Sequence, residues 1–62
     1  MKLAATITFT DLDSSDEAVA IVRSDESSVA VGLSLKSDGD LQVVMKKSDA
    51  ILLADALQKA AS

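Results

Sequence analysis

Apolar and polar residues alternate along three segments of the chain. In residues 2–10 every second side chain is apolar, and most of the intervening ones are threonine. Residues 29–36 and 41–47 repeat this period of two. Such a period, with many β-branched residues, is typical of strands that bury one face and expose the other. The sequence therefore predicts strands over these three segments.

The segment 17–23 fits two structures. Ser14 and Glu17 have the spacing of a helical capping box, and a short helix would place most of the apolar residues that follow on one side. Against a helix, the run is short, and Val19, Ile21 and Val22 are β-branched. We favour a strand that ends in a hairpin loop at residues 24–28. The alternative is a βαββα order in which residues 15–23 are helical.

The connection between the last two strands contains Ser-Asp-Gly at residues 37–39. A turn of only Asp38 and Gly39 would set apolar residues opposite polar ones. A three-residue loop sets Leu35 opposite Leu41 and keeps apolar residues on one face. Because a slip of one residue moves every side chain to the other face, we predict the longer loop, with Gly39 in the left-handed conformation.

The C-terminal segment is rich in alanine and leucine and predicts a helix that reaches about Ala61. Ser48 is the expected N-cap, and Asp49 would lie favourably at the positive end of the helix dipole. At 100° per residue, the stripe that faces the core comprises Ala50, Leu53, Ala54, Leu57 and Ala61. Ile51 and Leu52 fall outside this stripe and would be exposed in a monomer.

Together these elements predict a single small α+β domain over residues 1–62. It has three or four antiparallel strands and one C-terminal helix packed on one face of the sheet. The large residues expected beneath the helix are Leu3, Ile7, Phe9, Val19, Ile21, Val31, Leu33, Val43 and Met45.

The opposite face of this predicted sheet is lined by small, mostly uncharged residues, whereas an exposed antiparallel face is normally rich in charged ones. A 62-residue chain buries only about 60% of its unfolded surface, and this one has no cysteine for a disulfide and no histidine for a zinc site. We therefore predict a homodimer. The expected interface residues are Thr6, Thr8, Ala20, Val22, Ala30, Gly32 and Val44 on the sheet, with Ile51 and Leu52 on the helix.

The net charge of the whole chain is −4, and the negative charge is concentrated in one segment. Residues 11–26 contain one cation, Arg23, and an acidic patch made of Asp11, Asp13, Asp16, Glu17, Asp25 and Glu26. Negative charge repels nucleic acids and anionic membranes, and the single aromatic residue, Phe9, offers no platform for stacking bases. We expect no direct nucleic-acid or membrane binding and, with no cysteine, a cytoplasmic location.

No arrangement of residues in the sequence indicates catalysis, a cofactor or a metal. An EF-hand register that starts at Asp11 requires glycine at the sixth position and glutamate at the twelfth, where the chain has Asp16 and Val22. No serine has a histidine partner, and no glycine-rich phosphate loop is present. The sequence favours a non-enzymatic protein–protein interaction module that dimerises with itself. The alternative is an acidic inhibitor, of the phage or mobile-element type, that blocks a basic protein that handles nucleic acid.

Overall fold

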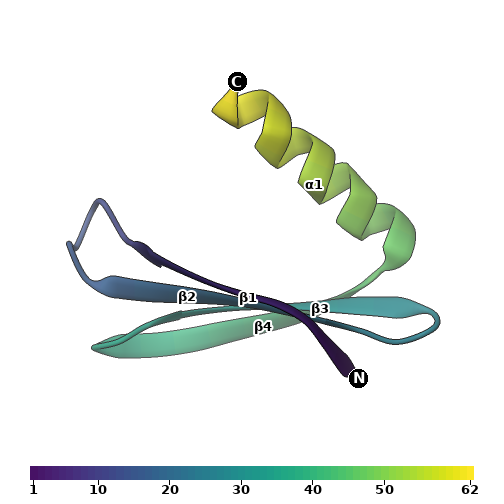
Figure 1. The fold of residues 1–62 in the computed structure, drawn as a ribbon, viewed down its shortest axis with the longest axis horizontal. Helices are drawn as coiled ribbons and strands as arrows, with labels where there is room; N and C mark the ends of the chain where they lie inside the picture. The colour runs from purple at the N-terminus through teal and green to yellow at the C-terminus, as the bar shows by residue number, and fades with distance from the viewer.

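The computed structural model describes residues 1–62, which form one antiparallel sheet followed by one helix. The elements are β1 (Lys2–Thr10), β2 (Glu17–Ser24), β3 (Ser28–Leu35), β4 (Asp38–Lys46) and α1 (Lys47–Ala61). The four strands lie side by side in the order β1-β2-β3-β4, so that each pairs with its neighbour in the chain (Figure 1). The predicted α+β fold is confirmed, with four strands rather than three. Residues 17–23 belong to a strand, so the helical alternative is wrong.

The pairing register sorts the side chains onto two faces. We call one the apolar face; it carries Ile7, Phe9, Ala18, Ala20, Val22, Val31, Leu33, Leu41, Val43 and Met45. We call the other the small-residue face; it carries Thr6, Thr8, Val19, Ile21, Arg23, Ala30, Gly32, Ser34, Gln42 and Val44. Directly paired residues project to the same side of a sheet, which fixes both sets.

Strand β2 is turned over relative to the sequence prediction. Phe9 pairs with Ala18 and Ile7 with Ala20, so these alanines lie on the apolar face. Val19 and Ile21 lie instead on the small-residue face. The sequence of β2 is apolar at both odd and even positions, so its own pattern does not select a face. Its pairing with β1 and β3 makes the selection.

The hairpin between β3 and β4 turns at Lys36 and Ser37 rather than at residues 37–39. Leu33 consequently pairs with Leu41, and the register is interrupted where Gly39 bulges out of β4. No glycine of the chain has a positive φ, so the predicted left-handed Gly39 is wrong. The register differs from the predicted one by two residues, and a shift of two leaves every side chain on its predicted face.

Helix α1 begins where β4 ends, with no loop between them. Lys46 is both the last residue of β4 and the helix N-cap, with an extended backbone (φ −66°, ψ 155°) and no capping side chain. The pairing of Ser28 with Lys46 closes the ladder between β3 and β4, and this sets the start of the helix. Ser48 therefore lies inside the first turn, and its predicted role as the N-cap is wrong.

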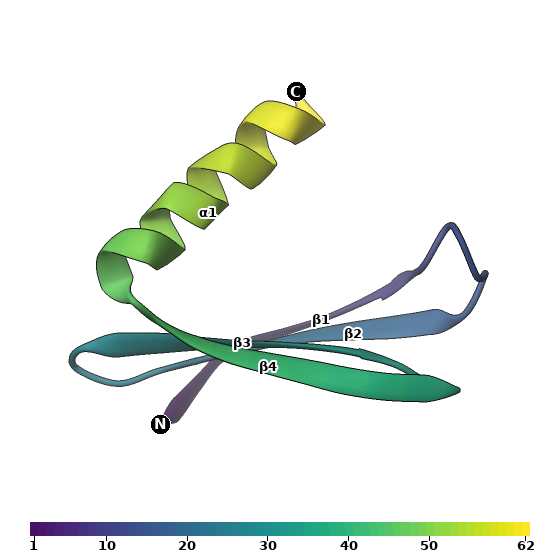
Figure 2. The ribbon, with the colours of Figure 1, turned by 180° about the vertical axis from the view of Figure 1, so that it is seen from behind.

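Without a loop, α1 rises steeply from the end of the sheet and stands away from it (Figures 1 and 2). It contacts only β3 and β4. No residue of α1 is buried, and in the whole chain only Ala18 and Ala30 are buried. The helix lies on one side of the sheet, as predicted, but most of the large residues expected beneath it remain exposed.

The single chain is more open than a compact protein of its size. Its accessible surface is 4839 Å², against about 3,800 Å² expected for a compact protein of this mass. Its radius of gyration is 12.5 Å, against about 10.6 Å for a compact domain of this length. Backbone hydrogen bonds hold the sheet together, while most apolar side chains remain in contact with water.

Candidate functional site

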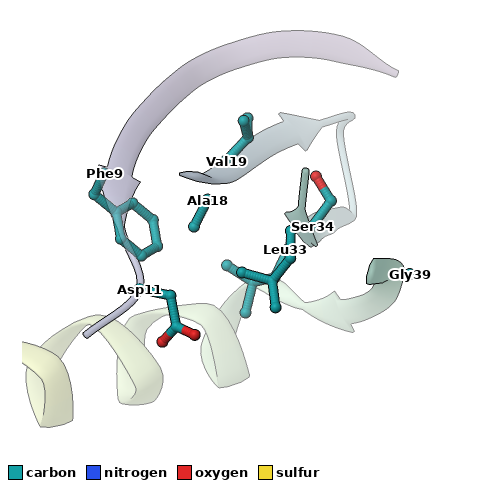
Figure 3. Close-up of a pocket in the computed structure, with 8 residues that line it drawn as sticks. Phe9, Asp11, Ala18, Val19, Leu33, Ser34 and Gly39 are labelled. Carbon is teal, nitrogen blue, oxygen red and sulfur yellow. The ribbon is translucent and has the colours of Figure 1, made fainter. Parts of the chain in front are cut away.

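The chain has two apolar surfaces, one on the sheet and one on α1, and α1 stands on the same side of the sheet as Phe9, Ala18 and Leu33 (Figure 3). The first is the apolar face of the sheet, and the second is the apolar stripe of α1, formed by Ala50, Leu53, Ala54, Leu57 and Ala61. We call the two together the apolar wedge. Figure 3 shows Phe9, Ala18 and Leu33 pointing to the side of the sheet where the helix lies, whereas Val19 points the other way.

The walls of the apolar wedge are exposed. On the sheet, the exposed fractions of the large residues range from 47% to 65%, for Ile7, Phe9, Leu33, Leu41 and Val43. On the helix, Leu53 is 42% exposed and Leu57 is 62% exposed. None of these positions carries a charge. A contiguous apolar surface of this kind is rare on monomeric proteins and marks sites where another apolar surface binds.

A shallow hollow lies in the wedge near the turn between β1 and β2. Phe9, Ala18, Leu33 and Leu35 line it, with Asp11 at its rim (Figure 3). Its volume of about 230 Å³ lies below the range of about 300–1,000 Å³ that is usual for small-molecule sites. The hollow therefore fits a side chain of a partner better than a separate ligand.

The interface residues predicted from the sequence do not share one surface. Thr6, Thr8, Ala30, Gly32 and Val44 lie on the small-residue face as expected. Ala20 and Val22 lie on the apolar face, because β2 is turned over. Ile51 and Leu52 are on α1, with 69% and 68% of their surface exposed.

The small-residue face is already partly closed by its own side chains. Ala30 lies between Arg23 and Val44 in the sheet and is only 2% exposed, so its longer neighbours cover it without a partner. Val44 itself is 56% exposed. The larger uncovered apolar area thus lies on the opposite face, on residues that sequence reasoning placed in a core beneath the helix.

The acidic patch predicted from the sequence is divided between the two ends of the sheet. Successive turns of an antiparallel meander alternate between ends, so the turn with Asp25 and Glu26 lies opposite the turn between β1 and β2. The turn between β3 and β4 lies beside the latter. We call this shared region the acidic end; it contains Asp11, Asp13, Asp16, Glu17, Asp38 and Asp40, with Lys36 as a nearby cation.

Asp16 links the two turns of the acidic end. Its Oδ2 accepts hydrogen bonds from the backbone N–H of Ser37 at 2.9 Å and from the Ser37 hydroxyl at 2.6 Å. Its Oδ1 accepts the backbone N–H of Glu17 at 2.9 Å. Donors aimed at the charged form favour it, so the Ser37 hydroxyl, followed by the Ser37 N–H, lowers the pKa of Asp16 from its ordinary value of 3.8.

Two other aspartates shape single turns in the same way. The Ser14 hydroxyl donates to Asp11 Oδ2 at 2.6 Å and lowers the pKa of Asp11. Asp25 Oδ1 accepts the backbone N–H of Ser27 at 3.0 Å and the hydroxyl of Ser28 at 2.8 Å, and these bonds lower the pKa of Asp25. No group of three or more acidic, histidine or cysteine side chains is arranged to hold a metal ion. These carboxylates therefore serve as turn-forming acceptors.

No protein-family model matches the chain, and no curated protein or solved structure matches it either. The chain contains no helix with the length and apolar character that crossing a bilayer requires.

Proposed function

We propose that the protein is a non-enzymatic protein–protein interaction module that works as a homodimer, with the apolar wedge as its interface. The observation that carries this proposal is the excess of exposed surface. The chain exposes about 1,000 Å² more than a compact protein of its mass. A standard protein interface buries about 800 Å² on each partner, so one interface of ordinary size accounts for most of this excess.

A second copy of the chain is a suitable partner for the wedge. In a two-fold dimer the same patch serves on both subunits, which requires a surface that complements itself. The wedge supplies both an apolar sheet face and an apolar helix stripe, and the residues that form these two surfaces are uncharged, with Asp11 only at the rim of the hollow. We place this dimer in the cytoplasm, because a chain without cysteine needs no oxidising compartment to fold.

Sedimentation equilibrium of the wild-type protein over a range of concentrations tests the proposal. We expect a species of twice the 6.4 kDa chain mass that dissociates only on dilution. The physical reason is that a monomer leaves the wedge in water, at a cost of about 25 cal/mol for each Å² of apolar surface. A single 6.4 kDa species at high micromolar concentration would contradict the homodimer.

A second candidate function is inhibition of a basic, nucleic-acid-handling protein. It is favoured by the way the fold brings the carboxylates of two separate turns together at the acidic end, away from the start of α1. Such a surface speeds association with a basic site through electrostatic steering, and moderate salt weakens this attraction. This function would use a different surface from the wedge, so it is compatible with dimerisation.

The acidic inhibitor hypothesis is tested with charge reversals at the two ends of the sheet. Glu17→Lys at the acidic end is expected to weaken capture of a DNA-binding protein from lysate by roughly tenfold, because it removes one attraction and adds one repulsion. Glu26→Lys, also at an exposed glutamate, makes the same charge change at the opposite end and should have little effect. Capture that resists moderate salt, or that both variants retain equally, would count against this function.

A further inference from the structure

We infer that the homodimer is built by exchange of helices: α1 of each copy packs on the apolar face of the other copy. This inference rests on the proposed function and adds the identity of the two surfaces that meet. The occupant of the wedge is thus a defined segment, residues 47–61 of a second chain.

The direct connection between β4 and α1 limits the helix to contacts with β3 and β4 and keeps it from covering the rest of its own sheet. Strand-to-helix connections that reverse the chain direction normally use about two to six residues. Here Lys46 closes the β-ladder and Lys47 opens the helix, so none is available. The helix therefore leaves the sheet steeply, and Leu53 and Leu57 remain exposed although an apolar sheet face lies on the same side.

The position of α1 also disfavours the simplest alternative, in which two apolar sheet faces pack together. Packed sheets lie about 10 Å apart, which is about the diameter of one helix with its side chains. Because α1 stands over the apolar face, a second sheet that approached this face would meet the helix first (Figure 2). A helix from a second copy, in contrast, can enter the open side of the wedge.

Exchange of helices in a two-fold dimer covers both apolar surfaces of each chain. The helix stripe of the first copy covers the sheet of the second, and the helix of the second copy covers the sheet of the first. This gives each sheet the helical layer that a four-stranded antiparallel sheet needs on its apolar side. A short connection that cannot close within one chain is a known route to dimers that exchange an element.

The first test lengthens the connection between β4 and α1. A Gly-Ser-Gly-Ser-Gly insertion between Lys46 and Lys47 lets α1 fold back onto its own sheet, so we expect the dimer mass to fall by half. The matched control carries the same segment after Ser62, where it lengthens no connection, and should remain a dimer. A dimeric insertion variant would overturn helix exchange while leaving the homodimer in place.

The second test locates the contact without altering the connection. The chain has no cysteine, so each introduced cysteine is unique. We mix the Leu33→Cys chain, whose thiol lies on the sheet, with the Leu53→Cys chain, whose thiol lies on the helix. A short bismaleimide cross-linker is then added. Helix exchange predicts mixed products that join the two variants and exceed the products of either variant with itself.

The outcomes separate the inference from the proposed function. Helix exchange is wrong if wild-type protein is dimeric but the sheet–sheet or helix–helix products equal or exceed the mixed product. It is also wrong if wild-type protein is dimeric and no mixed product forms. In both cases the homodimer remains supported. If wild-type protein is a monomer, both are wrong. Should the insertion variant fail to fold, the cross-linking result decides the question by itself.

Discussion

We expect the substitution Val43→Asp to dissociate the homodimer and the neighbouring substitution Val44→Asp to leave it intact. The two valines are adjacent in the edge strand β4 and have similar exposure in the single chain, 47% and 56%. Val43 lies on the apolar face, and Val44 lies on the small-residue face. The pair therefore compares the two faces with the residue type, strand and chemical change held constant.

The expected difference is large because a two-fold dimer contains each substitution twice. Covering the exposed part of Val43 is worth about 1 kcal/mol, and an unpaired carboxylate at the same place costs several kcal/mol more. With about 3 kcal/mol lost per copy, or about 6 kcal/mol per dimer, the dissociation constant rises about 10,000-fold. At Val44 the carboxylate stays in water, so the dissociation constant should change less than about threefold.

Sedimentation velocity at several concentrations measures both variants, and circular dichroism shows whether each still folds. Val44→Asp is also the control for folding, because both substitutions place the same poor strand former in the same edge strand. Dissociation by Val44→Asp with an intact Val43→Asp dimer would reverse the assignment and put the interface on the small-residue face, where the sequence alone placed Thr6, Thr8 and Gly32.

The element types of this fold follow from local patterns, whereas their faces and orientation do not. Residues 6–10 alternate strictly, and β1 spans Lys2–Thr10 with one irregularity between Leu3 and Ala5. In β2, alanine, valine and isoleucine occupy both the odd and the even positions. Only pairing with the neighbouring strands therefore decides that Ala20 lies beside Leu33 on the apolar face. An alternating pattern shows which side of a strand is buried only where the intervening residues are polar.

The sequence does not reveal the apolar wedge if an amphipathic helix is expected to cover the nearest sheet face. The signal against this assumption was present: the predicted strand reached Lys47 and the predicted helix began at Ser48, which leaves no residue to reverse the chain. The division of the acidic residues was also predictable, because a meander places Asp25 and Asp16 at opposite ends of the sheet. Local sequence patterns do not show how the helix and the turns are placed relative to the sheet, because the lengths of the connections determine this placement.

The second prediction concerns Asp16, whose side chain makes the hydrogen bonds that join the two turns of the acidic end. The other side-chain hydrogen bonds and the one ion pair of the protein span at most four residues, whereas the hydrogen bonds from Ser37 to Asp16 span 21. In a chain with only two buried residues, these hydrogen bonds are among the few long-range contacts outside the backbone pairing of the strands. We expect Asp16→Asn to lower the free energy of unfolding at pH 7, because one amide oxygen cannot replace both carboxylate oxygens.

The effect should depend on pH in a defined direction. The folded protein lowers the pKa of Asp16 below its ordinary value of 3.8, so the unfolded chain binds its proton more readily. The stability that the carboxylate contributes is therefore fully present above the unfolded pKa and is lost as the pH falls through the folded pKa. Urea unfolding of wild type and Asp16→Asn should differ by a constant amount at neutral pH, and the difference should shrink below about pH 4.

Asp13→Asn is the matched control, because it removes the same charge from the same turn at a side chain without hydrogen bonds. If loss of negative charge alone changed stability, both variants would behave alike. Ser37→Ala removes the hydroxyl that donates to Asp16 and leaves the backbone hydrogen bond from Lys36 to Glu17 in place, so it should lower stability in the same direction as Asp16→Asn at pH 7. Equal unfolding curves for Asp16→Asn and Asp13→Asn across the whole pH range would show that the link between the turns does not stabilise the sheet.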